Sequence, residues 1–147
     1  MLVDQILAEK GSSVFTIDEQ TTVADAVAEL RRWNVGALVV AGNGNPIIGV
    51  VSERDVVRAI ADRGASALGE TVSGIMTREV VTCGPQASID DVMQKMTGSR
   101  IRHMPIVDPA ADGALIGIIS IGDVVKRRVD ELETDRKSLE DYITLGR

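Results

Sequence analysis

Residues 48–55 read Ile-Gly-Val-Val-Ser-Glu-Arg-Asp, and residues 116–123 repeat the pattern as Ile-Gly-Ile-Ile-Ser-Ile-Gly-Asp. In each copy, a short aliphatic run typical of a strand is followed by a serine, and an aspartate stands three residues after that serine. The likeness extends outward, because Val14-Phe15-Thr16 and Val80-Val81-Thr82 begin two matching stretches of chain. The offset of 66 residues at these starts becomes 68 at the aspartates, which places a two-residue insertion in the turn at 108–113. The chain is therefore an internal repeat of two units.

Each repeat predicts the order strand, helix, strand, strand, helix. The first helices are expected to begin at Thr22 and Ser88, each followed three residues later by an aspartate, as in a capping box. The other predicted elements are strands at 37–40, 48–51, 104–107 and 116–119, and closing helices that begin near Asp55 and Asp123. Because the glycine-containing stretch 42–46 lies between two strands, it predicts a hairpin turn and not a phosphate-binding loop.

A unit of three short strands and two helices leaves too much apolar surface exposed to be stable alone. Two such units packed sheet to sheet would bury that surface and leave clefts between the halves. We therefore predict a mixed α/β (α+β) fold of two pseudo-twofold-related repeats, each with a small three-stranded sheet and two helices, plus a C-terminal helix. The expected divisions are 1–66 for the first repeat with its lead-in, 67–130 for the second with its lead-in, and 131–147 for a helical tail.

Composition narrows the classes of function. The 147-residue chain is 44% hydrophobic with one Trp, one Tyr and one Phe, which predicts an aliphatic core. Its formal net charge of −6 argues against nucleic acid and anionic membranes as partners. No apolar run approaches the ~20 residues of a membrane helix, and no export signal stands at the start, so a cytoplasmic protein is expected. The lone Cys83 excludes an internal disulfide. With a single histidine and no metalloprotease spacing, neither an enzyme nor a metal site is expected.

The repeated patterns at 48–55 and 116–123 resemble the repeats of the cystathionine-β-synthase-type (CBS) domain family. So do Arg102-His103-Met104-Pro105-Ile106-Val107 and Gly74-Ile75-Met76-Thr77, and the resemblance extends from about residue 3 to about residue 129. It implies a pair of CBS domains, a Bateman module, that binds an adenosine nucleotide between its repeats and catalyses nothing. The implied ligand is AMP in first place, with ADP, ATP or NAD(H) as alternatives, and no catalytic cofactor is implied.

The resemblance also implies the site residues of the cleft. It assigns the two ribose hydroxyls to the aspartates, here Asp123 and Asp55; one ionised carboxylate can accept hydrogen bonds from both hydroxyls. The alternative is that each aspartate only caps a helix. Asp123 is expected to mark the principal site, with Ser120 at a helix N-terminus and with Arg102 and His103 toward the phosphate. Met104 and Pro105, which follow Arg102 and His103, are also expected to line this side of the cleft. S-adenosylmethionine has no phosphate for Arg102 and His103 to bind, which disfavours it.

The first repeat departs from this pattern. Gly36 and Ala37 stand where the second repeat has Arg102 and His103, so the cleft of Asp55 and Ser52 is expected to lack a cation and to bind weakly or stay empty. Arg54 is a candidate replacement cation there, or else a surface residue. The resemblance places Thr16 and Thr82 near the adenine; the alternative is that both are β-branched residues suited to strands.

The C-terminal tail predicts association. Val125, Val129 and Leu132 fall at helical spacing, as do Leu139, Tyr142 and Ile143, with charged residues between them. A homodimer is expected, in the flat four-repeat disc that the resemblance implies, together with an unknown protein target. The alternative function is therefore an interaction or dimerisation scaffold that has no physiological ligand.

Overall fold

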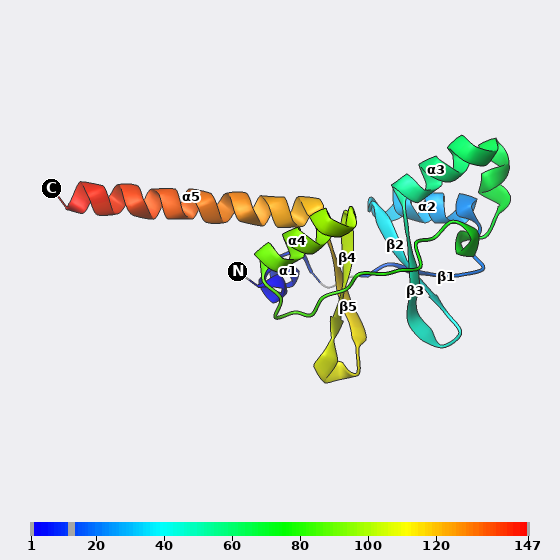
Figure 1. Cartoon of the computed structure of the whole chain (residues 1–147), viewed down its shortest axis with the longest axis horizontal. Helices are drawn as coiled ribbons and strands as arrows, with labels where there is room; N and C mark the ends of the chain where they lie inside the picture. Colours follow the sequence, from blue (N-terminus) through cyan, green and yellow to red (C-terminus); the bar gives the residue numbers. More distant parts are fainter. Residues whose placement is uncertain (1, 12–13, 147) are drawn as a thin grey trace.

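The computed structural model describes residues 2–11 and 14–146. Two similar units lie side by side, and a long C-terminal helix extends from the second (Figure 1). The first unit contains β1 (Thr16–Asp18), α2 (Val23–Trp33), β2 (Ala37–Gly42), β3 (Asn45–Ser52) and α3 (Glu53–Arg63). The second contains α4 (Ile89–Ser99), β4 (His103–Asp108), β5 (Ala114–Ser120) and α5 (Ile121–Leu145). Helix α1 (Val3–Lys10) precedes the first unit, and the short 3-10 turns are η1 (Gly64–Gly69), η2 (Val72–Gly74) and η3 (Pro109–Ala111).

Helices α2 and α4 begin where predicted, with Thr22 and Ser88 as N-caps, although only the half of each capping box in which the hydroxyl accepts is formed. The Thr22 hydroxyl accepts the backbone N–H of Asp25 at 3.2 Å, and the Ser88 hydroxyl accepts that of Asp91 at 3.1 Å. Helices α3 and α5 begin with reciprocal capping boxes, in which a serine is the N-cap and the aspartate three residues later accepts the serine N–H. The two site aspartates are therefore the third residues of their helices and not the N-caps.

The fold class is confirmed, with one difference between the sheets. The first sheet has the order β1-β2-β3, with β1 parallel to β2 and β2 antiparallel to β3. Within residues 2–11 and 14–146, the second contains only β4 and β5. Residues 80–82, which begin the second repeat and match the start of β1, form no strand, and the nearest pairing is a single bridge between Cys83 and Ile106. Gly84 and Pro85 follow at once, and a proline, which has no N–H, cannot continue a ladder.

The predicted hairpin turn at 42–46 is also confirmed. Asn43 and Gly44 both have positive φ, 51° and 74°, as the two central residues of a type I′ turn require. The second hairpin has a longer loop, 109–113, in which Asp112 and Gly113, with φ of 55° and 73°, follow the 3-10 turn η3.

The segment that precedes each repeat, called its lead-in, packs in the hydrophobic core of the other unit. Helix α1 contributes Val3, Ile6 and Leu7 to the core of the second unit. The segment after η1 contributes Val72 and Met76 to the core of the first. The divisions expected at 1–66 and 67–130 therefore separate the sequence repeats, while each hydrophobic core draws on both.

Each lead-in sits on the glycine of the repeated Ile-Gly pattern. A Cβ atom added at Gly49 would lie 2.5 Å from the Met76 Sδ, and one added at Gly117 would lie 2.6 Å from a Leu7 methyl. Because the repeated glycine has no side chain, a residue from the lead-in of the other repeat can pack directly against the strand.

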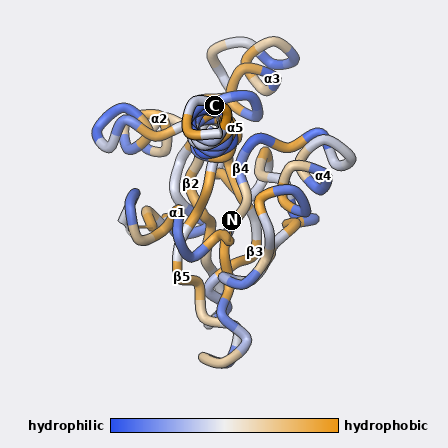
Figure 2. The backbone as a smooth tube through the Cα atoms, turned by 90° about the vertical axis from the view of Figure 1, so that its left-hand side faces the viewer, coloured by the Kyte–Doolittle hydropathy of each residue, from blue (hydrophilic) through white to orange (hydrophobic). Residues whose placement is uncertain are grey.

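Hydrophobic residues gather along the strands, whereas the helices alternate hydrophobic and hydrophilic residues (Figure 2). The largest fully buried side chains are Leu38, Met104, Ile106 and Ile119 from the strands and Ile89 and Met96 from α4. Within residues 2–11 and 14–146, none of the helices combines the length and apolar character needed to cross a membrane.

Candidate functional site

A cavity of about 210 Å³ lies between the two units. The first unit lines it with Gly36, Val50, Arg58 and the start of α3 at 52–55. The second unit lines it with 100–103 and Pro105, and the connecting segment adds Thr77, Glu79, Val80 and Val81. The site is thus built across the repeats, with α3 of one facing the beginning of β4 of the other.

The capping box of α3 holds the carboxylate of Asp55 at this cavity. Its Oδ2 accepts the Ser52 backbone N–H at 2.9 Å and the Ser52 hydroxyl at 3.1 Å. Its Oδ1 accepts the Thr77 hydroxyl at 3.4 Å, a long contact. Because a carboxylate has about four acceptor positions, Asp55 retains capacity to accept hydrogen bonds from a ligand.

Four arginines line the same cavity: Arg54, Arg58, Arg100 and Arg102. Arg54 and Arg58 stand four residues apart on α3, which places them on one face of the helix. Across residues 2–11 and 14–146, none of the four guanidinium groups forms an ion pair with a carboxylate. The carboxylates of the lining are Glu53, Asp55 and Glu79. The cavity therefore carries more positive than negative groups in a chain of net charge −6, and it favours an anion.

His103 reaches across from β4 to the first unit. A Cβ atom added at Gly36 would lie 2.9 Å from the His103 Nε2, so the bare glycine makes room for the imidazole. Burial lowers the pKa of His103, and the positive charges of Lys10 and Arg102 lower it further against the opposing charges of Glu53 and Asp123. The ring is therefore neutral near pH 7, able to donate one hydrogen bond and accept another.

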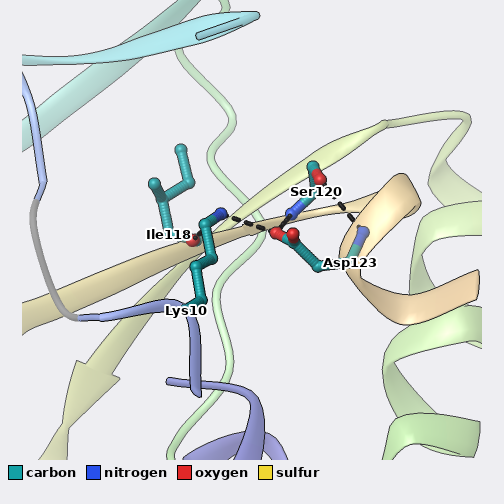
Figure 3. A network of polar contacts seen from close by, with 4 residues as sticks. All are labelled: Lys10, Ile118, Ser120 and Asp123. Carbon is teal, nitrogen blue, oxygen red and sulfur yellow. Dashed lines mark hydrogen bonds and ion pairs between the residues drawn. The ribbon is translucent and has the colours of Figure 1, made fainter. Parts of the chain in front are cut away.

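The equivalent carboxylate in the second unit, Asp123, already has a cationic partner (Figure 3). The Lys10 Nζ, at the end of α1, donates to the Asp123 Oδ2 at 2.5 Å and to the Ile118 carbonyl at 2.9 Å. The Ser120 N–H donates to the same carboxylate at 2.8 Å. Burial by itself raises the pKa of Asp123, but the hydrogen bonds from Lys10 and Ser120 outweigh it, so the net shift is downward. Asp123 is an ionised group paired within the protein.

The structure groups the predicted residues differently from the sequence. Asp55, Ser52, Arg54, Arg102, His103 and Pro105 line one cavity, while Asp123 and Ser120 are not in its lining. The expectation that the Asp55 cleft lacks a cation is therefore wrong, and Arg54, the candidate replacement cation, does line it. Aligning the repeats compares positions within a unit, but the cleft takes one wall from each unit. The cations of β4 thus face the aspartate of the other repeat.

The remaining predicted residues lie apart from the cavity. Met104 is fully buried in the core of the second unit. Thr16 and Thr82 are not among the lining residues, where Val80 and Val81 of the connecting segment are found instead.

Sequence reasoning missed several lining residues. Arg58 had a usable signal in its four-residue spacing from Arg54, and Thr77 ends the Gly74–Thr77 motif. Arg100 and Glu79 have no distinguishing sequence context, because only the packing of the two units brings them to the cavity.

Comparison with known proteins gives a consistent result. A family model for the CBS domain matches residues 10–62 and 72–130. The mitochondrial CBS domain-containing protein CBSX3 of Arabidopsis thaliana is 37% identical, over 98% of this chain and 72% of that protein. The crystal structure of a CBS-domain containing protein from Agrobacterium tumefaciens is 40% identical with a TM-score of 0.82, covering 87% of this chain and 99% of that one.

Two similar structures contain adenosine ligands. A CBS domain protein from Pyrobaculum aerophilum complexed with AMP has a TM-score of 0.73 at 28% identity, covering 84% of this chain and 89% of that one. A CBS domain pair in complex with 5-methylthioadenosine and S-adenosyl-L-methionine has a TM-score of 0.74 at 25% identity, with coverages of 86% and 98%. With both repeats matched by the family model and the fold shared with these structures, the chain belongs to the CBS domain family as a tandem pair of repeats.

Proposed function

We propose that the chain is a non-catalytic regulatory module that binds a phosphate-bearing adenosine nucleotide, AMP in first place, in the cavity between Asp55 and Arg102. The observation that carries this proposal is the convergence of four arginines and Asp55, the third residue of α3, on a cavity built by both repeats. ADP, ATP and NAD(H) present the same adenine, ribose diol and phosphate, and they are the alternatives.

Each part of such a ligand has a counterpart in the cavity. The Asp55 carboxylate would accept hydrogen bonds from the ribose hydroxyls. The guanidinium groups would bind phosphate, which arginine can do bidentately, and the neutral His103 would add a donor. The apolar side chains that would flank an adenine are Val50, Val80, Val81, Ile101 and Pro105. A volume of about 210 Å³ is below the ~300 Å³ of smaller ligand pockets, so we expect the phosphates to extend toward solvent.

The similar structures support an adenosyl ligand, but they do not indicate which group is attached to the adenosine. One is crystallised with AMP, and another with two ligands that carry no phosphate. The choice of phosphate for this chain rests on its own arginines. We assign Asp123 to a second and weaker site, since Lys10 already holds its carboxylate.

The absence of catalysis is part of the proposal. Cys83 is buried in the core of the second unit and lies outside the lining of the cavity. Burial raises the pKa of its thiol, which keeps it in the unreactive protonated form. A homodimer, an unknown protein target that responds to the bound nucleotide, and a cytoplasmic location remain expectations based on the sequence.

Titration calorimetry of AMP against the protein and two matched variants tests the proposal. Asp55→Asn should weaken AMP binding by about ten- to a hundredfold, because charged hydrogen bonds are worth about 1.5–3 kcal/mol. Asp123→Asn should change the affinity by less than about twofold. In either variant the amide oxygen can still accept the serine N–H, so the melting temperature without ligand should stay close to that of the parent.

Adenosine serves as the ligand control, and it should bind at least about tenfold more weakly than AMP because it cannot use the arginines. Loss of binding in Asp123→Asn with binding kept in Asp55→Asn would move the principal site to the second unit. No heat with millimolar AMP, ADP, ATP or NAD(H) would reject nucleotide binding and favour the scaffold alternative, which the exposed apolar residues of α5 support.

A further inference from the structure

Helix α5 is 25 residues long, and the part of it from Leu132 onward is exposed to solvent. Its first turns pack on the second unit, where Val124 is buried and Arg127 pairs with Glu9 at 2.6 Å. Beyond these turns it extends away from both units (Figure 1), and every residue from Leu132 to Gly146 is exposed. Isolated helices of this kind are marginal in water and usually owe their stability to packing.

One face of this helix carries a regular seam. Val125, Val129, Leu132, Arg136, Leu139 and Ile143 follow one another at alternating steps of four and three residues. The five apolar members are 47 to 61% exposed. Val125, the first residue of the seam, follows the buried Val124 directly, and one residue corresponds to about 100° around the helix. The seam therefore lies on a different side of the helix from Val124, which faces the second unit. The body therefore leaves this face open along the length of the helix.

We propose that the seam pairs with the same seam of a second copy as an antiparallel two-helix coiled coil. An apolar spacing that averages 3.5 residues is the pattern that makes two helices wind around each other. The seam holds about three heptads, in which Val129, Arg136 and Ile143 take the a positions and Val125, Leu132 and Leu139 the d positions.

Charge selects the direction of the second helix. In a parallel pair, equivalent a positions face each other, which would set Arg136 against Arg136 of the second copy in the centre of the seam. Asp135 at a g position would also face Glu140 at an e position. Like charges at both places disfavour the parallel arrangement.

An antiparallel pair removes the contact of Arg136 with Arg136 and that of Asp135 with Glu140, but it sets Glu133 against Glu133 and Asp135 against Asp135 of the second copy. Val125 then faces Ile143 of the second copy, Val129 faces Leu139, and Leu132 packs on the aliphatic stem of Arg136. At the edges Lys126 faces Glu140 of the second copy, and the guanidinium of Arg136 comes beside Glu133 and Asp135. The two Arg136 side chains thereby supply the countercharge for these two like-charged pairs at the midpoint of the helices, whereas in a parallel pair the arginines would face each other. The overlap from 125 to 143 is about 27 Å at 1.5 Å per residue.

Sedimentation equilibrium of the whole chain tests the pairing. The double variant Leu132→Glu, Leu139→Glu should weaken self-association by at least about tenfold, because it places charges in the seam. The control Thr134→Glu, Ser138→Glu adds the same charge outside the seam and should stay within about twofold of the parent. Equal association of the parent, the seam variant and the control would overturn the proposal, as would a parent that stays at 15.7 kDa up to millimolar concentration.

Disulfide exchange in a glutathione buffer tests the direction, with Cys83→Ala as the background. Chains carrying Val129→Cys are mixed with chains carrying Leu139→Cys. The antiparallel pair predicts that the mixed disulfide dominates, because these two positions face each other. If each variant instead cross-links mainly with itself, the helices are parallel and the proposed direction is wrong.

Discussion

The two capping boxes of this chain are nearly identical, yet their aspartates have different neighbours. In both, the backbone N–H of a serine donates to the aspartate three residues later, at 2.9 Å for Asp55 and 2.8 Å for Asp123. The lead-ins, which align at an offset of 69 residues, place Lys10 against Asp123, whereas the equivalent residue Glu79 lines the cavity that Asp55 also lines. The repeated motif sets the position of each carboxylate, and the lead-in decides whether it is free for a ligand.

The largest expected effect concerns the glycines beneath the two lead-ins. Gly49→Ala should lower the free energy of unfolding by about 2–3 kcal/mol and Gly117→Ala by about 1–2 kcal/mol, within the range of overpacked cores. The first costs more because the added Cβ would also lie 3.0 Å from the Thr77 backbone carbonyl, whereas at Gly117 it would meet only side-chain atoms of Leu7. Urea unfolding of the two variants measures the difference.

Double variants separate a steric clash from a loss of backbone freedom. Leu7→Ala added to Gly117→Ala should cost less than the sum of the single changes, because the shortened side chain removes the clash. Met76→Ala should relieve Gly49→Ala only in part, since the Thr77 carbonyl remains. Strict additivity in both pairs would show that the lead-ins do not press on these glycines.

Local chemistry accounts for the part of this molecule that the sequence predicts well. Thr22 and Ser88 begin their helices as expected, and Asn43-Gly44 makes the predicted turn, because capping and turn geometry depend on near neighbours in the chain. The bridge at Cys83 stays a single bridge for an equally local reason, since Pro85 has no N–H with which to extend the ladder.

The contents of the cleft depend on distant packing, and there the sequence prediction was wrong. Aligning the repeats shows that Arg102 corresponds to Gly36, but it does not show that both line the same cavity from opposite units. The exchange of lead-ins is similarly hidden, because it depends on which core Leu7 and Met76 enter. The pairing of Lys10 with Asp123 follows from that exchange.

A smaller effect is expected on releasing Asp123 from its lysine. Lys10→Met should lower the free energy of unfolding by no more than about 1 kcal/mol, since the side chain of Lys10 is 35% exposed and solvent screens the pair. Calorimetry with AMP should then show a second binding event, at least about tenfold weaker than the first because the arginine cluster lies at the other cleft. Lys10→Arg keeps the ion pair and should show no second event. A single event in all three proteins would mean that Lys10 does not control the second cleft.

The smallest effect concerns pH and His103, and it has opposite signs for stability and for binding. The pKa of His103 is lowered in the folded chain, so below pH ~6.5 the unfolded chain binds a proton that the folded chain does not. The free energy of unfolding should therefore fall as the pH drops from about 6.5 through the lowered pKa. His103→Gln should remove this part of the pH dependence.

Binding of AMP should respond in the other direction. A phosphate near the imidazole favours the protonated ring, so the pKa of His103 should rise in the complex and binding should take up protons. The affinity for AMP should then increase by about two- to fivefold as the pH falls from 8 to 6.5, well below the limit of tenfold per pH unit for a single proton. Adenosine, which has no phosphate, should show almost no such increase, and neither should AMP with His103→Gln.

If the variant keeps the full pH dependence with AMP, the proton is taken up elsewhere and His103 does not face the phosphate. If adenosine shows the same increase as AMP, the imidazole responds to closure of the cavity and not to the charge of the ligand.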